Sequence, residues 1–130
     1  MELNEYQRAA LRTAVYPGMN IREGFEYTLF GMLGEGGELA NKYKKILRNR
    51  EHYQDHRTLL MDELGDVLWY ALAVASELGY TLEEVAAFNL AKLAARQATG
   101  TLKQHGNDDW VKGWVEHDLV STPPPGICIK

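Results

Sequence analysis

The sequence predicts an all-α protein, with a four-helix bundle as its architecture. Apolar residues recur at helical spacing between residues 3 and 100, and no stretch of useful length alternates apolar and polar residues as a strand does. Proline, glycine and capping residues mark the ends of four such segments. We expect oligomerisation to complete the bundle, because the apolar faces are broader than one bundle of this length can cover.

The first two predicted helices cover residues 3–15 and 23–47. Pro17 and Gly18 end the first one, since proline cannot continue a helix and glycine favours a turn. The second contains the stretch "LGEGGELANK" and is followed by the charged segment "RNREHYQDH". We predict that this segment is a loop.

The third and fourth predicted helices cover residues 56–78 and 81–100. Gly79 closes the third, because glycine readily adopts the left-handed conformation found beyond a helix end. Thr81 and Glu84 have the spacing of a capping box, which satisfies free backbone donors in the first turn of the fourth helix.

The chain has 130 residues, which suits a single core. We predict a helical domain over residues 1–100 and a C-terminal extension over residues 101–130. Trp110 and Trp114 suggest that part of the extension packs on the body, whereas "STPPPG" makes the remainder irregular.

Composition narrows the classes of function. The net charge of −4 argues against a general nucleic-acid binder, which needs surplus Lys and Arg. Cys128 is the only cysteine, so the chain fits a reducing compartment. The N-terminus lacks a secretory pattern, and the longest apolar run is too short to cross a bilayer. We therefore expect a cytoplasmic protein without membrane or nucleic-acid partners.

Two pairs of acids stand beside apolar stripes of neighbouring helices. Glu35 and Glu38 lie in the second predicted helix, and Glu63 and Asp66 lie in the third, within "MDELGDVLWY". In each pair the acids are three residues apart and flank an apolar stripe. If the stripes pack together, the four carboxylates come to one place.

Four carboxylates at one place repel each other, and a hard divalent cation relieves that repulsion. Mg²⁺ prefers oxygen ligands and often retains substrate phosphates in its shell. The alternative for each pair is a solvated helix face that pairs with lysines such as Lys42. A di-iron site is a further alternative, but it uses Glu-x-x-His, and no histidine here follows a glutamate by three residues.

Four glycines surround the first acidic pair, at positions 31, 34, 36 and 37. Each glycine inside a helix costs about 1 kcal/mol relative to alanine. We expect Gly34, Gly36 and Gly37 to leave space for a second helix, or for metals and phosphates, close to the backbone.

The acids have the order E-x-x-E, then 24 residues, then E-x-x-D. With "LGEGGEL", "DELGDVLWYALA" and "ELGYTLEEVAAFNLAKLAAR", this pattern resembles the MazG-like all-α nucleoside triphosphate pyrophosphohydrolases over residues 3–100. The chain is most similar in form to compact single-domain members, including phage-encoded ones. A phage origin would place it in the host cytoplasm.

The resemblance implies metal-dependent hydrolysis of (deoxy)nucleoside triphosphates to monophosphate and pyrophosphate. It implies Mg²⁺, with Mn²⁺ as a substitute, and two or more ions per site. Glu35, Glu38, Glu63 and Asp66 match the metal-binding, catalytic acids of the family. One of the four also orients or deprotonates the attacking water, but the pattern does not say which.

The resemblance also suggests how the substrate is held. Asn89, Lys92 and Arg96 lie near one helix face and match the substrate-contacting helix, and Lys42 is a weaker substrate-binding candidate. The alternative is a solvated basic face for the first three and a helix-dipole role for Lys42. Family members form homodimers or homotetramers, so we expect the same here.

The resemblance favours purine substrates such as dGTP, because some compact phage members act on guanine nucleotides. Two alternatives remain open at this stage. One is a house-cleaning hydrolase of noncanonical or pyrimidine deoxynucleotides. The other is a non-catalytic helical interaction module with the same fold.

Overall fold

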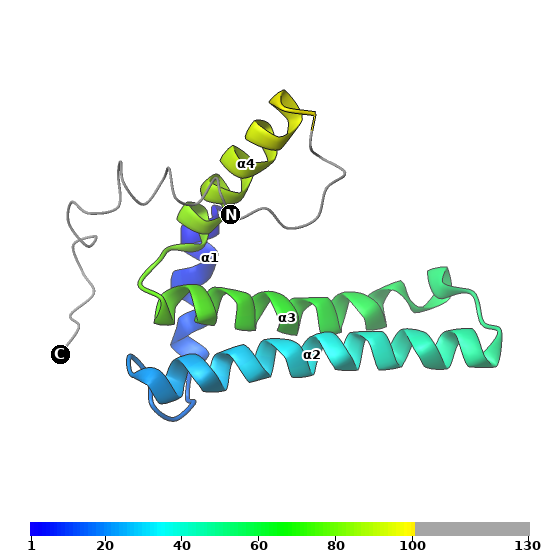
Figure 1. Cartoon of the computed structure of the whole chain (residues 1–130). Helices are drawn as coiled ribbons and strands as arrows, with labels where there is room; N and C mark the ends of the chain where they lie inside the picture. The colour runs from blue at the N-terminus through cyan, green and yellow to red at the C-terminus, as the bar shows by residue number, and fades with distance from the viewer. Residues whose placement is uncertain (101–130) are drawn as a thin grey trace. The chain divides into compact units, whose positions relative to one another are not determined.

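The computed structural model describes residues 1–100, and the secondary structure in that range is helical (Figure 1). The elements are α1 (Leu3–Ala10), the 3-10 helix η1 (Leu11–Thr13), α2 (Arg22–Asn49), the 3-10 helix η2 (Tyr53–His56), α3 (Arg57–Glu77) and α4 (Leu82–Ala98). The described residues thus contain four α-helices and no strand, which confirms the all-α prediction. The predicted extension, with Trp110 and Trp114, lies outside them.

The predicted bounds are close for the last two helices, whereas the predicted C-terminal ends of the first two helices are wrong. The first helix ends at Ala10 and tightens into η1, where the Thr13 hydroxyl donates to the Ala10 carbonyl oxygen at 2.7 Å. The second helix continues to Asn49 and ends at Arg50, whose φ of 56° is left-handed. The predicted charged loop is therefore shorter than expected, and η2 forms within it.

Helices α2 and α3 lie side by side along most of their lengths (Figure 1). Leu72 and Ala73 of α3 are fully buried, as is Thr28 of α2. The Thr28 hydroxyl donates to the Gly24 carbonyl oxygen at 2.9 Å, which satisfies the polar group inside the apolar contact. This helix pair is the framework that carries both acidic pairs.

Gly79 ends α3 as predicted, with a φ of 81°. Its N–H donates to the Ser76 carbonyl oxygen, and the Tyr80 N–H donates to the Ala75 carbonyl oxygen, each at 2.9 Å. These two bonds form a Schellman motif, which satisfies carbonyls left free at the helix end. The capping box predicted at Thr81 stays a prediction.

The buried side chain of Gln7 fixes α1 to the end of α3. Its amide nitrogen donates to Ser76 Oγ at 2.8 Å and to the Tyr80 carbonyl oxygen at 3.2 Å. Its amide oxygen accepts a 2.6 Å hydrogen bond from the Leu82 N–H. One side chain therefore satisfies three polar groups that the turn after α3 would otherwise leave free.

An aromatic cluster packs beside α3. Tyr16 stacks on Tyr27 with ring centroids 5.9 Å apart and meets the Trp69 ring edge-on at 6.2 Å. Trp69 Nε1 donates to Thr13 Oγ1 at 3.0 Å. Tyr16 is largely buried, and its hydroxyl donates to Glu77 Oε1 at 2.7 Å; burial and this carboxylate raise the tyrosine pKa. Tyr16 and Tyr27 are thus part of the packing of the fold.

The chain divides into two compact units, Met1–Leu82 and Glu83–Lys130. The first contains α1, α2 and α3, and the second contains nearly all of α4. In the described part of the chain, every helix is too short or too polar to span a lipid bilayer.

Candidate metal centre

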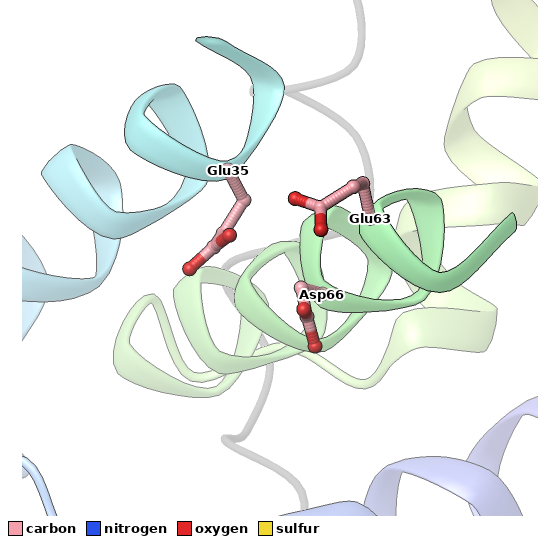
Figure 2. Close-up of side chains that lie close together, drawn as sticks. All are labelled: Glu35, Glu63 and Asp66. Atoms are coloured by element: carbon pink, nitrogen blue, oxygen red, sulfur yellow. The ribbon is translucent and has the colours of Figure 1, made fainter. Parts of the chain in front are cut away.

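Three acids from α2 and α3 meet between the two helices. Glu35 projects from α2 toward Glu63 and Asp66, which project from α3 (Figure 2). One carboxylate oxygen from each residue lies within 4.8 Å of the others. The spacing of three residues places Glu63 and Asp66 on neighbouring turns of one helix face, and the α2–α3 contact brings Glu35 opposite them.

Glu63 is the buried member of the cluster, with 5% of its surface exposed. Its Oε2 atom is buried and has no hydrogen-bond partner among residues 1–100. A buried polar atom without a partner costs free energy, and a carboxylate oxygen costs more than a neutral group. A buried oxygen in this state, on a residue that belongs to a set of acids, fits the binding of a cation.

The electrostatics of Glu35 agree with this interpretation. Desolvation raises the pKa of the Glu35 carboxyl, and the negative charges of Asp66, Glu38 and Glu63 raise it further. The positive charge of Lys42 acts in the opposite direction. The neighbouring acids therefore disfavour the carboxylate form of Glu35, and added positive charge relieves this repulsion.

Lys42 supplies part of the positive charge. Its ammonium group donates to Glu63 Oε1 and forms an ion pair across the α2–α3 interface. The contact with Glu63 is the main reason why the pKa of Lys42 is raised. The sequence suggested Lys42 as a weaker substrate-binding candidate, which stays a prediction; in this structure Lys42 pairs with an acid of the cluster.

Glu38 is the predicted acid that lies outside the three-residue cluster. It is exposed, and the set of oxygens within 4.8 Å includes Glu35, Glu63 and Asp66 but not Glu38. Its negative charge nevertheless acts on Glu35 and on Lys42. The structure thus brings three of the four predicted acids together and leaves Glu38 one helical turn from Glu35.

The predicted substrate-binding residues Asn89, Lys92 and Arg96 lie on α4 at spacings of three and four. They belong to the second compact unit, whereas the acids and Lys42 belong to the first. Their role toward the acids stays a prediction.

The glycines around Glu35 differ in their surroundings. A Cβ atom at Gly34, Gly36 or Gly37 would have no neighbour within 4 Å, so no helix of the described residues uses that space. A Cβ atom at Gly31 would instead collide with the ring of Tyr70. The expected close approach of a second helix occurs at Gly31, one turn before the acids.

An open groove of about 740 Å³ lies beside Asp66 on the first compact unit. Its lining residues come from α1 and α3: Tyr6, Thr58, Leu59, Met61, Asp62, Gly65, Asp66 and Trp69. The sequence did not indicate this groove, because the contact of α1 with α3 cannot be read from helical periodicity. The groove combines apolar and aromatic walls with carboxylates at one side.

The donor set of the centre consists of carboxylate oxygens, which are the ligands of hard divalent cations such as Mg²⁺. Fold and site together define an all-α protein with a carboxylate cluster between two paired helices. The family model of the MazG nucleotide pyrophosphohydrolase domain matches residues 23–101. The chain belongs to this family.

A phage protein is similar over most of the chain. The Gene 37 protein of Mycobacterium phage L5 is 42% identical over 113 residues, which is 83% of this chain and 99% of the relative. No solved structure gives a significant match.

Proposed function

We propose that this protein hydrolyses (deoxy)nucleoside triphosphates to a nucleoside monophosphate and pyrophosphate. The observation that carries the proposal is the cluster of Glu35, Glu63 and Asp66, in which a buried Glu63 oxygen lacks a partner. Membership of the pyrophosphohydrolase family supports the same reaction.

In this proposal the acids hold Mg²⁺, with Mn²⁺ as a substitute, and two or more ions bind per site. Glu35, Glu63 and Asp66 supply ligand oxygens, and Glu38 joins them through rotation of its exposed side chain. Such ions polarise phosphoryl oxygens and lower the pKa of bound water. One of the four carboxylates would accept a hydrogen bond from the attacking water and orient it.

The groove beside Asp66 is the proposed place for the nucleoside. Tyr6 and Trp69 offer aromatic surface for a base, and Asp66, one acid of the cluster, also lines the groove. Trp69 is held by its hydrogen bond to Thr13, so its ring is already oriented. We propose a purine deoxynucleotide such as dGTP as substrate, with noncanonical or pyrimidine nucleotides as the alternative.

Basic and amide groups complete the proposed substrate site. Asn89, Lys92 and Arg96 of α4 would contact the triphosphate, together with Lys42 once it leaves Glu63. Lysine and arginine neutralise phosphate charge, and asparagine donates a hydrogen bond.

We also propose a homodimer or homotetramer, acting in the host cytoplasm if the protein is phage-encoded. Large apolar side chains of α2 and α3 are exposed, and they include Phe30 at 67%, Leu33 at 64% and Leu64 at 55%. Apolar surface of this kind is typical of subunit contacts. Nucleic acids and membranes are not among the proposed partners.

A product assay tests the proposed reaction. The purified protein is incubated with Mg²⁺ and each standard NTP and dNTP, and products are separated by ion-exchange chromatography. We expect monophosphate and pyrophosphate in equal amounts, and loss of both with a chelator. Stable release of nucleoside diphosphate with orthophosphate would contradict the assignment.

Variants connect the reaction to the cluster. Glu63→Gln removes the charge of the buried acid at nearly constant shape, so we expect loss of most activity with helicity retained. Glu23→Gln, a change to an exposed glutamate at the start of α2, is the matched control. Absence of hydrolysis with every nucleotide would instead favour the non-catalytic interaction module.

A further inference from the structure

Lys42 and the acidic cluster share one carboxylate. Lys42 lies seven residues after Glu35 on α2, which is about two helical turns, so both side chains lie on similar faces of the helix. The Lys42 ammonium pairs with Glu63 Oε1, while Glu63 also belongs to the cluster with Glu35 and Asp66. Glu63 can therefore be neutralised by Lys42 or by a metal ion.

The two oxygens of Glu63 differ in their partners. Lys42 neutralises Oε1, whereas the buried Oε2 has no hydrogen-bond partner in the described part of the chain. A divalent cation bound at the cluster would contact the same carboxylate that the Lys42 ammonium contacts. The two positive charges would then repel each other. The side chain of Glu63 is only 7% exposed, so solvent screens the repulsion between the two cations weakly.

We infer that Lys42 is the counter-cation of the metal-free centre, and that a divalent cation displaces it from Glu63. The inference rests on the proposed function, since that function supplies the metal site. In the metal-free protein the ammonium compensates the charge of the buried carboxylate.

The Lys42 ammonium can reach water when it separates from Glu63. Its side chain is 28% exposed, so the flexible stem gives the ammonium access to water. The carboxylate of Asp62 already attracts it, and Asp62 is exposed. Displacement thus moves the ammonium from a buried acid to water and an exposed acid, where an anionic ligand can also reach it. Metal binding then precedes the contact of Lys42 with a phosphate group.

The first test is calorimetric titration of the metal-free full chain with Mn²⁺. Removal of the competing ammonium in Lys42→Met is expected to tighten Mn²⁺ binding by roughly fivefold or more, the lower end of usual coupling between linked sites. Lys44→Met is the matched control, because Lys44 is exposed and two residues further along the helix, on the opposite side. We expect its affinity to stay within about twofold of the wild type, since solvent screens an exposed charge.

The direction of the change separates two roles of Lys42. If Lys42 stays on Oε1 and holds Glu63 in position for the metal, Lys42→Met weakens Mn²⁺ binding. Weaker or unchanged affinity in Lys42→Met would overturn the inference, as would a wild-type protein that binds no Mn²⁺.

A second measurement uses the wild-type protein and does not depend on the folding of a variant. Lysines are acetylated at fixed pH with and without Mg²⁺, and the modification of each is followed by mass spectrometry. We expect Mg²⁺ to increase the rate at Lys42 severalfold and to leave Lys44 unchanged. Equal rates at Lys42 in both conditions would contradict displacement.

The inference and the proposed function can fail separately. Triphosphate hydrolysis by the wild-type protein, together with unchanged Mn²⁺ affinity in Lys42→Met, would remove the inference and leave the function. Tighter Mn²⁺ binding in Lys42→Met without hydrolysis of any nucleotide would support displacement and remove the function.

Discussion

Gly31 of α2 faces the ring of Tyr70 of α3, and a single added methyl group at position 31 would overlap that ring. The Tyr70 ring is also held edge-on against Trp69, with centroids 5.0 Å apart. Burial is the main cause of the raised pKa of the Tyr70 hydroxyl, and the charges of Glu35 and Asp66 contribute. The close approach of α2 and α3 beside the acidic cluster therefore depends on the missing side chain at position 31.

Gly31→Ala is expected to destabilise the protein. The added methyl group must displace Tyr70 or separate the helices, and overpacking of this kind costs typically about 1–3 kcal/mol. Chemical denaturation followed by circular dichroism measures the change in the free energy of unfolding. Wild-type stability or higher in this variant would contradict the packing described for Gly31.

Gly36→Ala and Gly37→Ala are the contrasting variants, because no described atom lies within 4 Å of a Cβ at either position. Alanine restricts the unfolded chain, so each change should stabilise the protein by about 0.4–1 kcal/mol. Kinetics on the same variants show whether substrate uses the open space. A raised KM or lowered kcat in a stabilised variant would place the substrate against these glycines.

The raised pKa of Glu35 predicts a pH dependence of the metal-free protein. The folded state holds the Glu35 proton more tightly than the unfolded state. The contribution of Glu35 to the free energy of unfolding is therefore largest at low pH. It decreases as the pH rises from the ordinary glutamate pKa through the raised one. Glu35→Gln should flatten this decrease in melting temperature, whereas Glu23→Gln should not. An unchanged pH profile in Glu35→Gln would show that the acids do not repel one another as described.

Gln7→Ala should loosen the turn between α3 and α4. The groups that now form hydrogen bonds with Gln7 lose their partner in this variant. Each buried group left without a partner costs about 1–3 kcal/mol. Gln54→Ala is the control, because Gln54 is exposed in η2. Thermal unfolding of both variants measures the difference, and equal melting temperatures would show that water replaces the Gln7 amide.

Oligomerisation is expected from the exposed apolar residues of α2 and α3. Light scattering should give a mass of at least two chains at micromolar concentration. Leu33→Glu places a charge within this surface and should reduce the mass, whereas Val15→Glu, at a residue that is 91% exposed after η1, should not. A stable, active wild-type monomer would overturn the proposed assembly.

Helical periodicity and end signals predicted the four helices, because both are local properties of the chain. The E-x-x-E and E-x-x-D spacings, with their position beside apolar stripes, predicted that acids of α2 and α3 meet. Three of them do so. These features depend on the repeat of a helix and on which of its faces is buried.

Other features depended on contacts between distant residues. Helical spacing gave no sign that Gly31, rather than Gly36 or Gly37, is the glycine against which α3 packs, since that depends on the register of two helices. The pairing of Lys42 with Glu63 also depends on how two helices pack together, and so does the groove beside Asp66. A helix wheel describes one helix, whereas each of these contacts belongs to two.

The hydrogen bonds of Gln7 also constrain how the chain acquires its structure during synthesis. Their partners lie 69, 73 and 75 residues further along the sequence. At about 5–20 residues per second, a ribosome needs roughly 4–15 s to make that length. Helix α1 is therefore made several seconds before the partners of Gln7, and these bonds form only after that interval. Until Leu82 has left the exit tunnel, the emerging chain presents an undocked α1 to chaperones and proteases.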